Sequence, residues 1–334
     1  MSTLLTSVRR TFSLYNPRLL FILAAVGLLW FALRNVSLHE IWRLLHQLKP
    51  QHLLLLMSIN GLIVVALGSR WWLFLAALGH RLPYLELARY RLAAFGVSYF
   101  TPGPHFGGEP LQVYLLQQRN GVTTADAVAS VTLDKVFDLL FNFVFLCVGF
   151  LLILAQLPSV GFSAAAVPYA VLAAALPLGL LMATATGRRP VSTALGAMGR
   201  YAAWGQSVYD LAYSSESQMI GLCQRQPRAL WMAALLSLLN WLMLIGEFWL
   251  ATYILRLNLT LMQAVFIMVA ARVAILLPMP AGLGALESGL VLAAGLLGLN
   301  PAAGISLGIL IRARDILVGL LGLWLASVDV GQVS

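Results

Sequence analysis

The 334-residue chain is 60% hydrophobic and only 10% charged, and its formal net charge is +9. An average soluble domain is about 25% charged, so this composition excludes an ordinary soluble protein. Apolar runs long enough to cross a bilayer as helices, about 18 residues or more, recur along the whole sequence. This recurrence excludes a soluble enzyme held by one membrane anchor.

The apolar runs predict an all-α polytopic membrane protein with about six full spans and two re-entrant helix-break-helix hairpins. In chain order the predicted apolar segments are 19–34, 53–78, 90–119, 124–155, 165–186, 229–255, 262–298 and 302–328. Proline and glycine interrupt two of them, in Thr101–Glu109 and in Pro278–Glu287, where they remove helical hydrogen bonds. We expect each interrupted segment to be a hairpin that returns to the side it entered from.

The distribution of basic residues predicts the orientation of the chain. With both hairpins re-entrant, twelve arginines fall on one side, namely Arg9, Arg10, Arg18, Arg81, Arg89, Arg91, Arg119, Arg188, Arg189, Arg200, Arg225 and Arg228. The other side receives four basic residues, Arg34, Arg43, Lys49 and Arg256. The positive-inside rule therefore places both termini in the cytoplasm, and it explains the net charge better than nucleic-acid binding does.

The sequence also contains a repeat at an offset of about 177 residues. The proline pair at 102 and 104 matches the pair at 278 and 280, and Lys135 and Asp138 match Arg312 and Asp315. We predict one integral membrane domain with inverted halves, about 53–155 and 229–328. An N-terminal span and loop (1–52) precede them, and a connecting span with a cytoplasmic amphipathic segment (156–228) joins them. Inverted repeats with broken helices are typical of transporters.

Basic residues inside apolar segments are the leading candidates for a binding site, because burying a cation in a bilayer costs about 2.5–3.5 kcal/mol. We expect Arg70, Lys135, Arg272 and Arg312 to bind an anionic headgroup, since arginine binds phosphate in a bidentate way. We expect four carboxylates to position these cations, those of Glu109, Glu287, Asp138 and Asp315. Arg314 and Asp134 fit a structural ion pair better.

Other features of the two breaks are weaker candidates. His105 could bind a headgroup or titrate, and the helices that open near Gly107 and Gly284 could present free N–H groups to an anion. The alternative for Glu109 and Glu287 is helix capping. The sequence contains no nucleotide-binding loop and no metal-ligand spacing, and Cys147 and Cys223 are expected to be free thiols, so we expect no cofactor and no metal.

Taken together, these residues resemble the transmembrane region of lysylphosphatidylglycerol synthases, a flippase-like family. The resemblance rests on Arg70-Trp71, on Pro102-Gly-Pro-His-Phe-Gly-Gly-Glu109, on the Asp134-Lys135 pair and on Pro278-x-Pro280 with Glu287. It implies lipid translocation without the soluble synthase domain. Gln112 and Lys135 stand where the family often has arginine.

We therefore expect a flippase or scramblase for an anionic, phosphate-bearing lipid, such as a phospholipid, a hopanoid-type lipid or a polyprenyl-phosphate-linked lipid. The expected location is a bacterial or archaeal cytoplasmic membrane, with a lipid-biosynthetic enzyme as a further partner. The alternative function is that of a membrane glycosyltransferase or headgroup transferase that uses a polyprenyl-phosphate donor. A scaffold for a synthase is less favoured, because a scaffold gains little from five intramembrane cations.

Overall fold

The computed structural model describes residues 49–101, 107–156, 166–198, 205–276 and 284–331. The predicted first span, His105 and the proline pairs at 102/104 and 278/280 lie outside these residues. In the described part every regular element is an α-helix. The helices are α4 (Pro50–Ala77), α5 (Tyr84–Phe100), α6 (Glu109–Asn120), α7 (Thr124–Gln156), α8 (Ala166–Ala185), α9 (Pro190–Met198), α10 (Gly205–Arg225), α11 (Pro227–Ile254), α12 (Leu261–Ile275), α13 (Ala285–Leu296) and α14 (Pro301–Gly331).

The helices confirm the predicted all-α polytopic membrane fold. Four of them, α4, α7, α8 and α11, are long and apolar enough to cross a bilayer. Large apolar side chains on their outer faces are exposed, among them Leu176 and Trp231. An exposed apolar surface on helices of this length fits contact with lipid. Helix α14 is as long as these spans but carries Arg312, Arg314 and Asp315 near its middle.

The helix boundaries reproduce the sequence repeat. Helices α4 and α11 begin at residues 50 and 227, α5 and α12 begin at 84 and 261, and α7 and α14 begin at 124 and 301. Each pair of starts is separated by 177 residues. Two four-helix units therefore share one order of elements, long, short, short, long, and the short helices flank the two broken segments.

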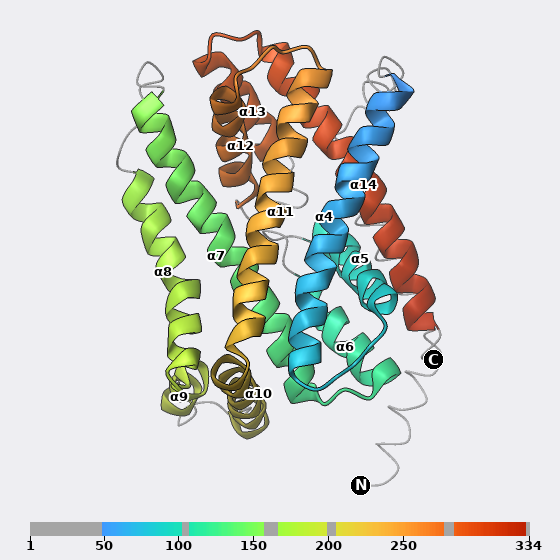
Figure 1. Cartoon of the computed structure of the whole chain (residues 1–334), viewed down its shortest axis with the longest axis vertical. Helices are drawn as coiled ribbons and strands as arrows, with labels where there is room; N and C mark the ends of the chain where they lie inside the picture. Colours follow the sequence, from blue (N-terminus) through green and yellow to red (C-terminus); the bar gives the residue numbers. More distant parts are fainter. Residues whose placement is uncertain (1–48, 102–106, 157–165, 199–204, 277–283, 332–334) are drawn as a thin grey trace, which may run out of the picture.

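The two units run in opposite directions (Figure 1). Helix α4 descends in that view while α11 ascends, and α7 ascends while α14 descends. The α5–α6 pair stays in the lower half of the molecule and the α12–α13 pair in the upper half. This arrangement fits the expected hairpins, and their re-entry into a bilayer stays a prediction.

Helices α4 and α11 cross through two equivalent hydrogen bonds. Arg70 Nη1 donates to Ser237 Oγ at 2.9 Å, and Asn60 Nδ2 donates to Glu247 Oε1 at 3.0 Å. Residues 60 and 237 are partners in the repeat, and so are 70 and 247. The crossing therefore resembles the self-complementary contact of a two-fold dimer, built within one chain.

The short helix of each unit packs on the second long helix of the other unit, α5 on α14 and α12 on α7. Glycines allow the close approach of α5 and α14. A Cβ added at Gly96 would lie 2.6 Å from the Gly319 carbonyl oxygen, and one at Gly322 would overlap the Leu92 carbonyl. Small residues at such crossings let membrane helices pack by backbone contact. The two units are thereby interlocked.

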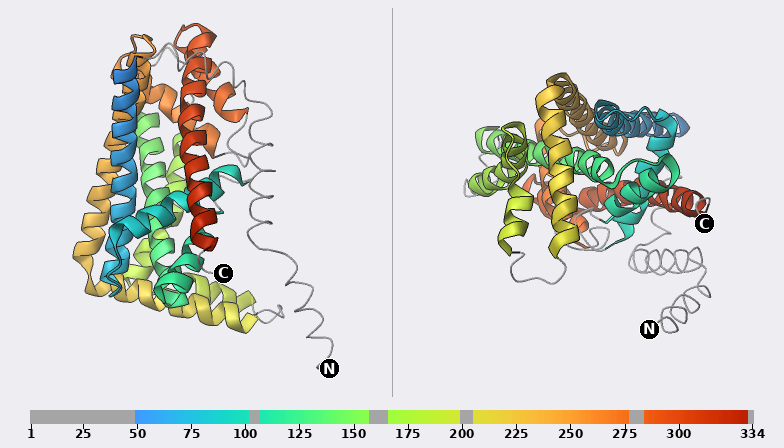
Figure 2. Two further views of the ribbon diagram at one scale, coloured as in Figure 1. Left: turned by 90° about the vertical axis from the view of Figure 1, so that its right-hand side faces the viewer. Right: turned by 90° about the horizontal axis from the view of Figure 1, so that it is seen from below.

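The connecting segment forms two helices, α9 and α10, as its amphipathic pattern predicts. Figure 2 shows α10 lying across one end of the helix bundle. The Glu216 carboxylate on α10 accepts hydrogen bonds from the backbone N–H groups of Val191 and Ser192, at 2.7 and 2.9 Å. It thereby satisfies free donors in the first turn of α9 and ties the two helices together.

Candidate functional site

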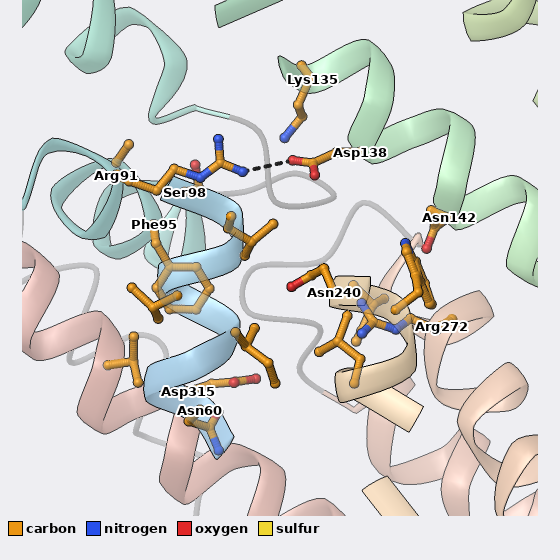
Figure 3. Close-up of a pocket in the computed structure, with 18 of the residues that line it drawn as sticks. Asn60, Arg91, Phe95, Ser98, Lys135, Asp138, Asn142, Asn240, Arg272 and Asp315 are labelled. Carbon is orange, nitrogen blue, oxygen red and sulfur yellow. Dashed lines mark hydrogen bonds and ion pairs between the residues drawn. The ribbon is translucent and has the colours of Figure 1, made fainter. Parts of the chain in front are cut away.

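A cavity of about 380 Å³ lies between the two units and is lined by α4, α5, α6, α7, α11, α12 and α14 (Figure 3). Much of its wall is apolar, but it also carries nine charged side chains. Four are cations, those of Arg91, Lys135, Arg272 and Arg314, and five are carboxylates, those of Glu109, Asp134, Asp138, Glu247 and Asp315. A cavity with this lining suits the polar headgroup of an amphipathic molecule.

Two arginines and two aspartates form a buried cluster on one side of the cavity. Arg70 Nε pairs with Asp134 Oδ1 at 2.7 Å, and its Nη2 contacts Asp138. Arg91 also pairs with both aspartates, and its Nη2 lies 3.1 Å from Asp138 Oδ2. Only 2% of the Arg70 side chain is exposed, and Arg70 stands behind the cavity wall. This charge-balanced cluster joins α4, α5 and α7.

Lys135 and its repeat partner Arg312 each form an ion pair with a glutamate of a hairpin. Lys135 Nζ lies 2.7 Å from Glu109 Oε1, and Arg312 Nε lies 2.5 Å from Glu287 Oε1. Each glutamate also accepts the backbone N–H of the glycine before its helix. Gly107 donates to Glu109 at 2.8 Å, and Gly284 donates to Glu287 at 3.0 Å. Glu287 therefore caps α13, and the two glutamates hold α6 and α13 to α7 and α14.

On another side of the cavity, one arginine pairs with two carboxylates. Arg314 Nη1 lies 2.5 Å from Glu247 Oε1, and Arg314 Nε donates to Asp315 Oδ1 at 2.8 Å. The same Glu247 oxygen accepts the hydrogen bond from Asn60. Arg314 was expected to be structural, and these contacts join α14 to α11 at the cavity wall.

Arg272 differs from the other cations that line the cavity. Its guanidinium lies over the Trp241 ring, 4.9 Å from the ring centroid, in a cation–π contact. Arg91, Lys135 and Arg314 each pair with a carboxylate, whereas Arg272 has neither an ion pair nor a hydrogen bond within the described residues. Its charge is therefore available to a ligand.

Three amide side chains in the cavity wall also have polar atoms without partners in the described part of the chain. These atoms are Gln112 Nε2, Asn142 Nδ2 and Asn240 Oδ1, all buried. Figure 3 shows Asn142 and Arg272 across the cavity from Arg91, with Asn240 between them. Buried polar groups normally have partners, so these three atoms are exceptions within the described residues.

The structure brings together five of the predicted site residues, Lys135, Arg272, Glu109, Asp138 and Asp315, in the wall of the cavity. It places Arg70 behind this wall, and Arg312 with Glu287 lies outside the lining. The N–H groups of Gly107 and Gly284 were expected to face an anion and instead donate to the glutamates.

Two charged wall residues were missed as site candidates. Arg91 was counted with the cytoplasmic arginines, but it lies in α5 and reaches Asp134 and Asp138. Glu247 was not among the expected site residues, although its repeat equivalent, Arg70, was. No group of three metal-ligating side chains occurs in the described ranges.

Comparison with known proteins gives one family. The sequence model of the lysylphosphatidylglycerol synthase TM region matches residues 18–322, and therefore covers both units and the segment between them. No curated protein matches the chain.

Proposed function

Since the chain belongs to the family of the lysylphosphatidylglycerol synthase TM region, a function tied to membrane lipids follows, and we propose that the protein translocates a phosphate-bearing lipid across the membrane as a flippase or scramblase. In this proposal the headgroup enters the cavity between the two units, and its phosphate binds Arg272. The acyl chains stay in the apolar surroundings of the bilayer.

The lack of a carboxylate partner for Arg272 carries the proposal. An arginine in a membrane segment costs about 2.5–3.5 kcal/mol unless its charge is compensated. The cation–π contact with the Trp241 ring offsets about 0.5–2 kcal/mol of this cost. Glu247, Asp315 and Asp138 act on Arg272 without forming an ion pair with it, and a phosphate that accepts two guanidinium hydrogen bonds would supply a direct partner.

The arrangement of the units supports translocation over mere binding. The cavity lies between two units that run in opposite directions, and substrate sites of transporters with inverted repeats lie in this position. Lys135–Glu109 and Arg312–Glu287 tie each hairpin to a long helix of its own unit. These pairs fix α6 to α7 and α13 to α14, while α5 packs on α14 of the other unit.

The experiment measures headgroup translocation of fluorescent phospholipids in proteoliposomes, for the native chain and for Arg272→Gln. Glutamine keeps a polar side chain but removes the charge, so we expect the translocation rate to fall at least tenfold. Arg228→Gln is the matched control, because Arg228 is exposed at the start of α11, the helix that carries Trp241, and is expected to keep the native rate. An unchanged rate for Arg272→Gln would falsify the assignment.

The same vesicles test the alternative enzymatic function. After incubation the lipid is extracted and its mass is measured. An intact lipid in the opposite leaflet supports translocation, whereas a lipid that has gained or lost a headgroup in proportion to time and protein supports a transferase instead.

A further inference from the structure

Helix α9 carries no charged residue and leaves one apolar face exposed. Its inner face packs on α10, where the Ser192 hydroxyl donates a hydrogen bond to Glu216 at 2.6 Å. Its outer face carries Val191, Ala194 and Ala197, which are all exposed, and 44% of Val191 is accessible. A short uncharged helix that exposes apolar side chains fits the interface of a bilayer better than it fits water.

The turn between α8 and α9 places α9 at the end of a candidate membrane span. Helix α8 is long and apolar enough to cross a bilayer, and it ends at Ala185. Gly187 then has a φ of +80°, and the Arg188 N–H donates to the Ala183 carbonyl at 2.8 Å, which is a glycine-dependent helix ending. Figure 2 shows α10 lying across this end of the bundle, and α9 packs on α10. Helix α9 therefore lies at the level where the headgroups of one leaflet are expected.

Two arginines directly before α9 have no carboxylate partner within the described ranges. Arg188 is exposed, and the Arg189 guanidinium lies over the Tyr213 ring, 4.3 Å from its centroid. The two acidic residues of α10 have other partners. Glu216 accepts three hydrogen bonds from the start of α9, and Asp210 accepts one from a glutamine on α10. Two positive charges therefore lie beside the apolar face, and this combination complements a negatively charged lipid surface.

We propose that α9 is an interfacial anchor for anionic phospholipids. Its apolar face enters the headgroup region of the adjoining leaflet, and Arg188 and Arg189 bind lipid phosphates there. None of these residues lines the cavity between the two units, so the bound lipids are distinct from the lipid that we propose is translocated. Both arginines belong to the set that the positive-inside rule assigns to the cytoplasm, where the membrane surface is negatively charged.

The first test measures hydrogen exchange of the α9 amides in the full chain, in nanodiscs of phosphatidylcholine with and without phosphatidylglycerol. An arginine near an anionic surface strengthens binding about fivefold. Two arginines predict that the α9 amides exchange about tenfold more slowly, or slower still, when phosphatidylglycerol is present. Equal exchange in the two membranes overturns the proposal. So does an equal slowing by inorganic phosphate in phosphatidylcholine nanodiscs, because it would show a site for a free ion.

Paired variants test whether the two arginines are responsible. Arg188→Gln with Arg189→Gln should abolish the effect of phosphatidylglycerol on α9. Arg225→Gln with Arg228→Gln is the matched control, because both arginines are exposed near the junction of α10 and α11 and the change in net charge is the same. The control should keep the effect. An effect that persists in the first variant, or is lost in both, overturns the assignment to Arg188 and Arg189.

A second measurement keeps both arginines and locates the apolar face. A nitroxide label is attached at Ala194→Cys, in a chain that carries Cys147→Ala and Cys223→Ala. Its relaxation by oxygen, which concentrates in the bilayer, is compared with its relaxation by a water-soluble nickel complex. The label at Ala194→Cys should respond mainly to oxygen, and a control label at Gln218→Cys, at an exposed position of α10, mainly to the nickel complex. A response at Ala194→Cys like that at Gln218→Cys overturns the proposal.

Discussion

Arg70 is the most deeply buried cation of the cluster beside the cavity, so its removal gives a sharp test of the ion pairs. In Arg70→Met, Asp134 and Asp138 keep only Arg91 as a partner, and Asp134 is itself buried. Breaking one side of a buried ion pair costs about 3–5 kcal/mol. The lost bond to Ser237 adds little, because that hydroxyl still donates to the Ala233 carbonyl at 2.8 Å. We therefore expect the free energy of unfolding to fall by about 3–5 kcal/mol.

The measurement is reversible unfolding in bicelles or mixed micelles, followed for the native chain, Arg70→Met and Arg70→Met/Asp134→Asn. The double variant leaves one arginine facing one aspartate, so it should recover about half of the loss. Arg228→Met is the surface control and should change stability by less than about 0.5 kcal/mol. A loss below about 1 kcal/mol in Arg70→Met, or no recovery in the double variant, would refute the argument from charge balance.

Two further predictions concern the contacts that hold the units together. Gly322→Ala should lower the free energy of unfolding by about 1–3 kcal/mol, because the new methyl group overlaps the Leu92 carbonyl. Gly295→Ala serves as the control in the same unfolding assay, because a methyl group there meets no atom within 4 Å. Asp329→Asn removes the carboxylate that pairs with Arg89 at 2.7 Å and Arg119 at 2.6 Å. Hydrogen exchange of α6 should then become faster, and an unchanged exchange rate would show that this contact does not restrain the helix.

The helices and the repeat were predictable because their signals are local. Proline and glycine mark the breaks, and runs of apolar residues mark the long helices. The 177-residue offset depends only on counting, and the helix starts reproduce it. The inverted arrangement follows from the same count, because with re-entrant hairpins three long helices, α4, α7 and α8, lie between the start of the first unit and the start of the second.

The partners of the charged residues were less predictable, because ion pairs form between helices that are far apart in sequence. Lys135 and Asp138 lie close on one helix, yet the carboxylate that the structure places at Lys135 Nζ belongs to Glu109 on α6. Arg91 looked like a residue of the cytoplasmic end and instead faces the cavity. That Arg272 forms no ion pair with a wall carboxylate in the described ranges becomes visible only when all of the pairs are known.

The hydrogen bonds at the α4–α11 crossing have a consequence for the energetics of the transport proposed above. Two identical inverted units would make the two ends of the molecule interchangeable, so a state open at one end would have the same free energy as its mirror state. Arg70 and Glu247 occupy equivalent positions with opposite charge and have different partners. The exchange symmetry is therefore broken at the point where the units meet. In the proposed flippase, the resting population would then be biased toward one open end even without a gradient across the membrane.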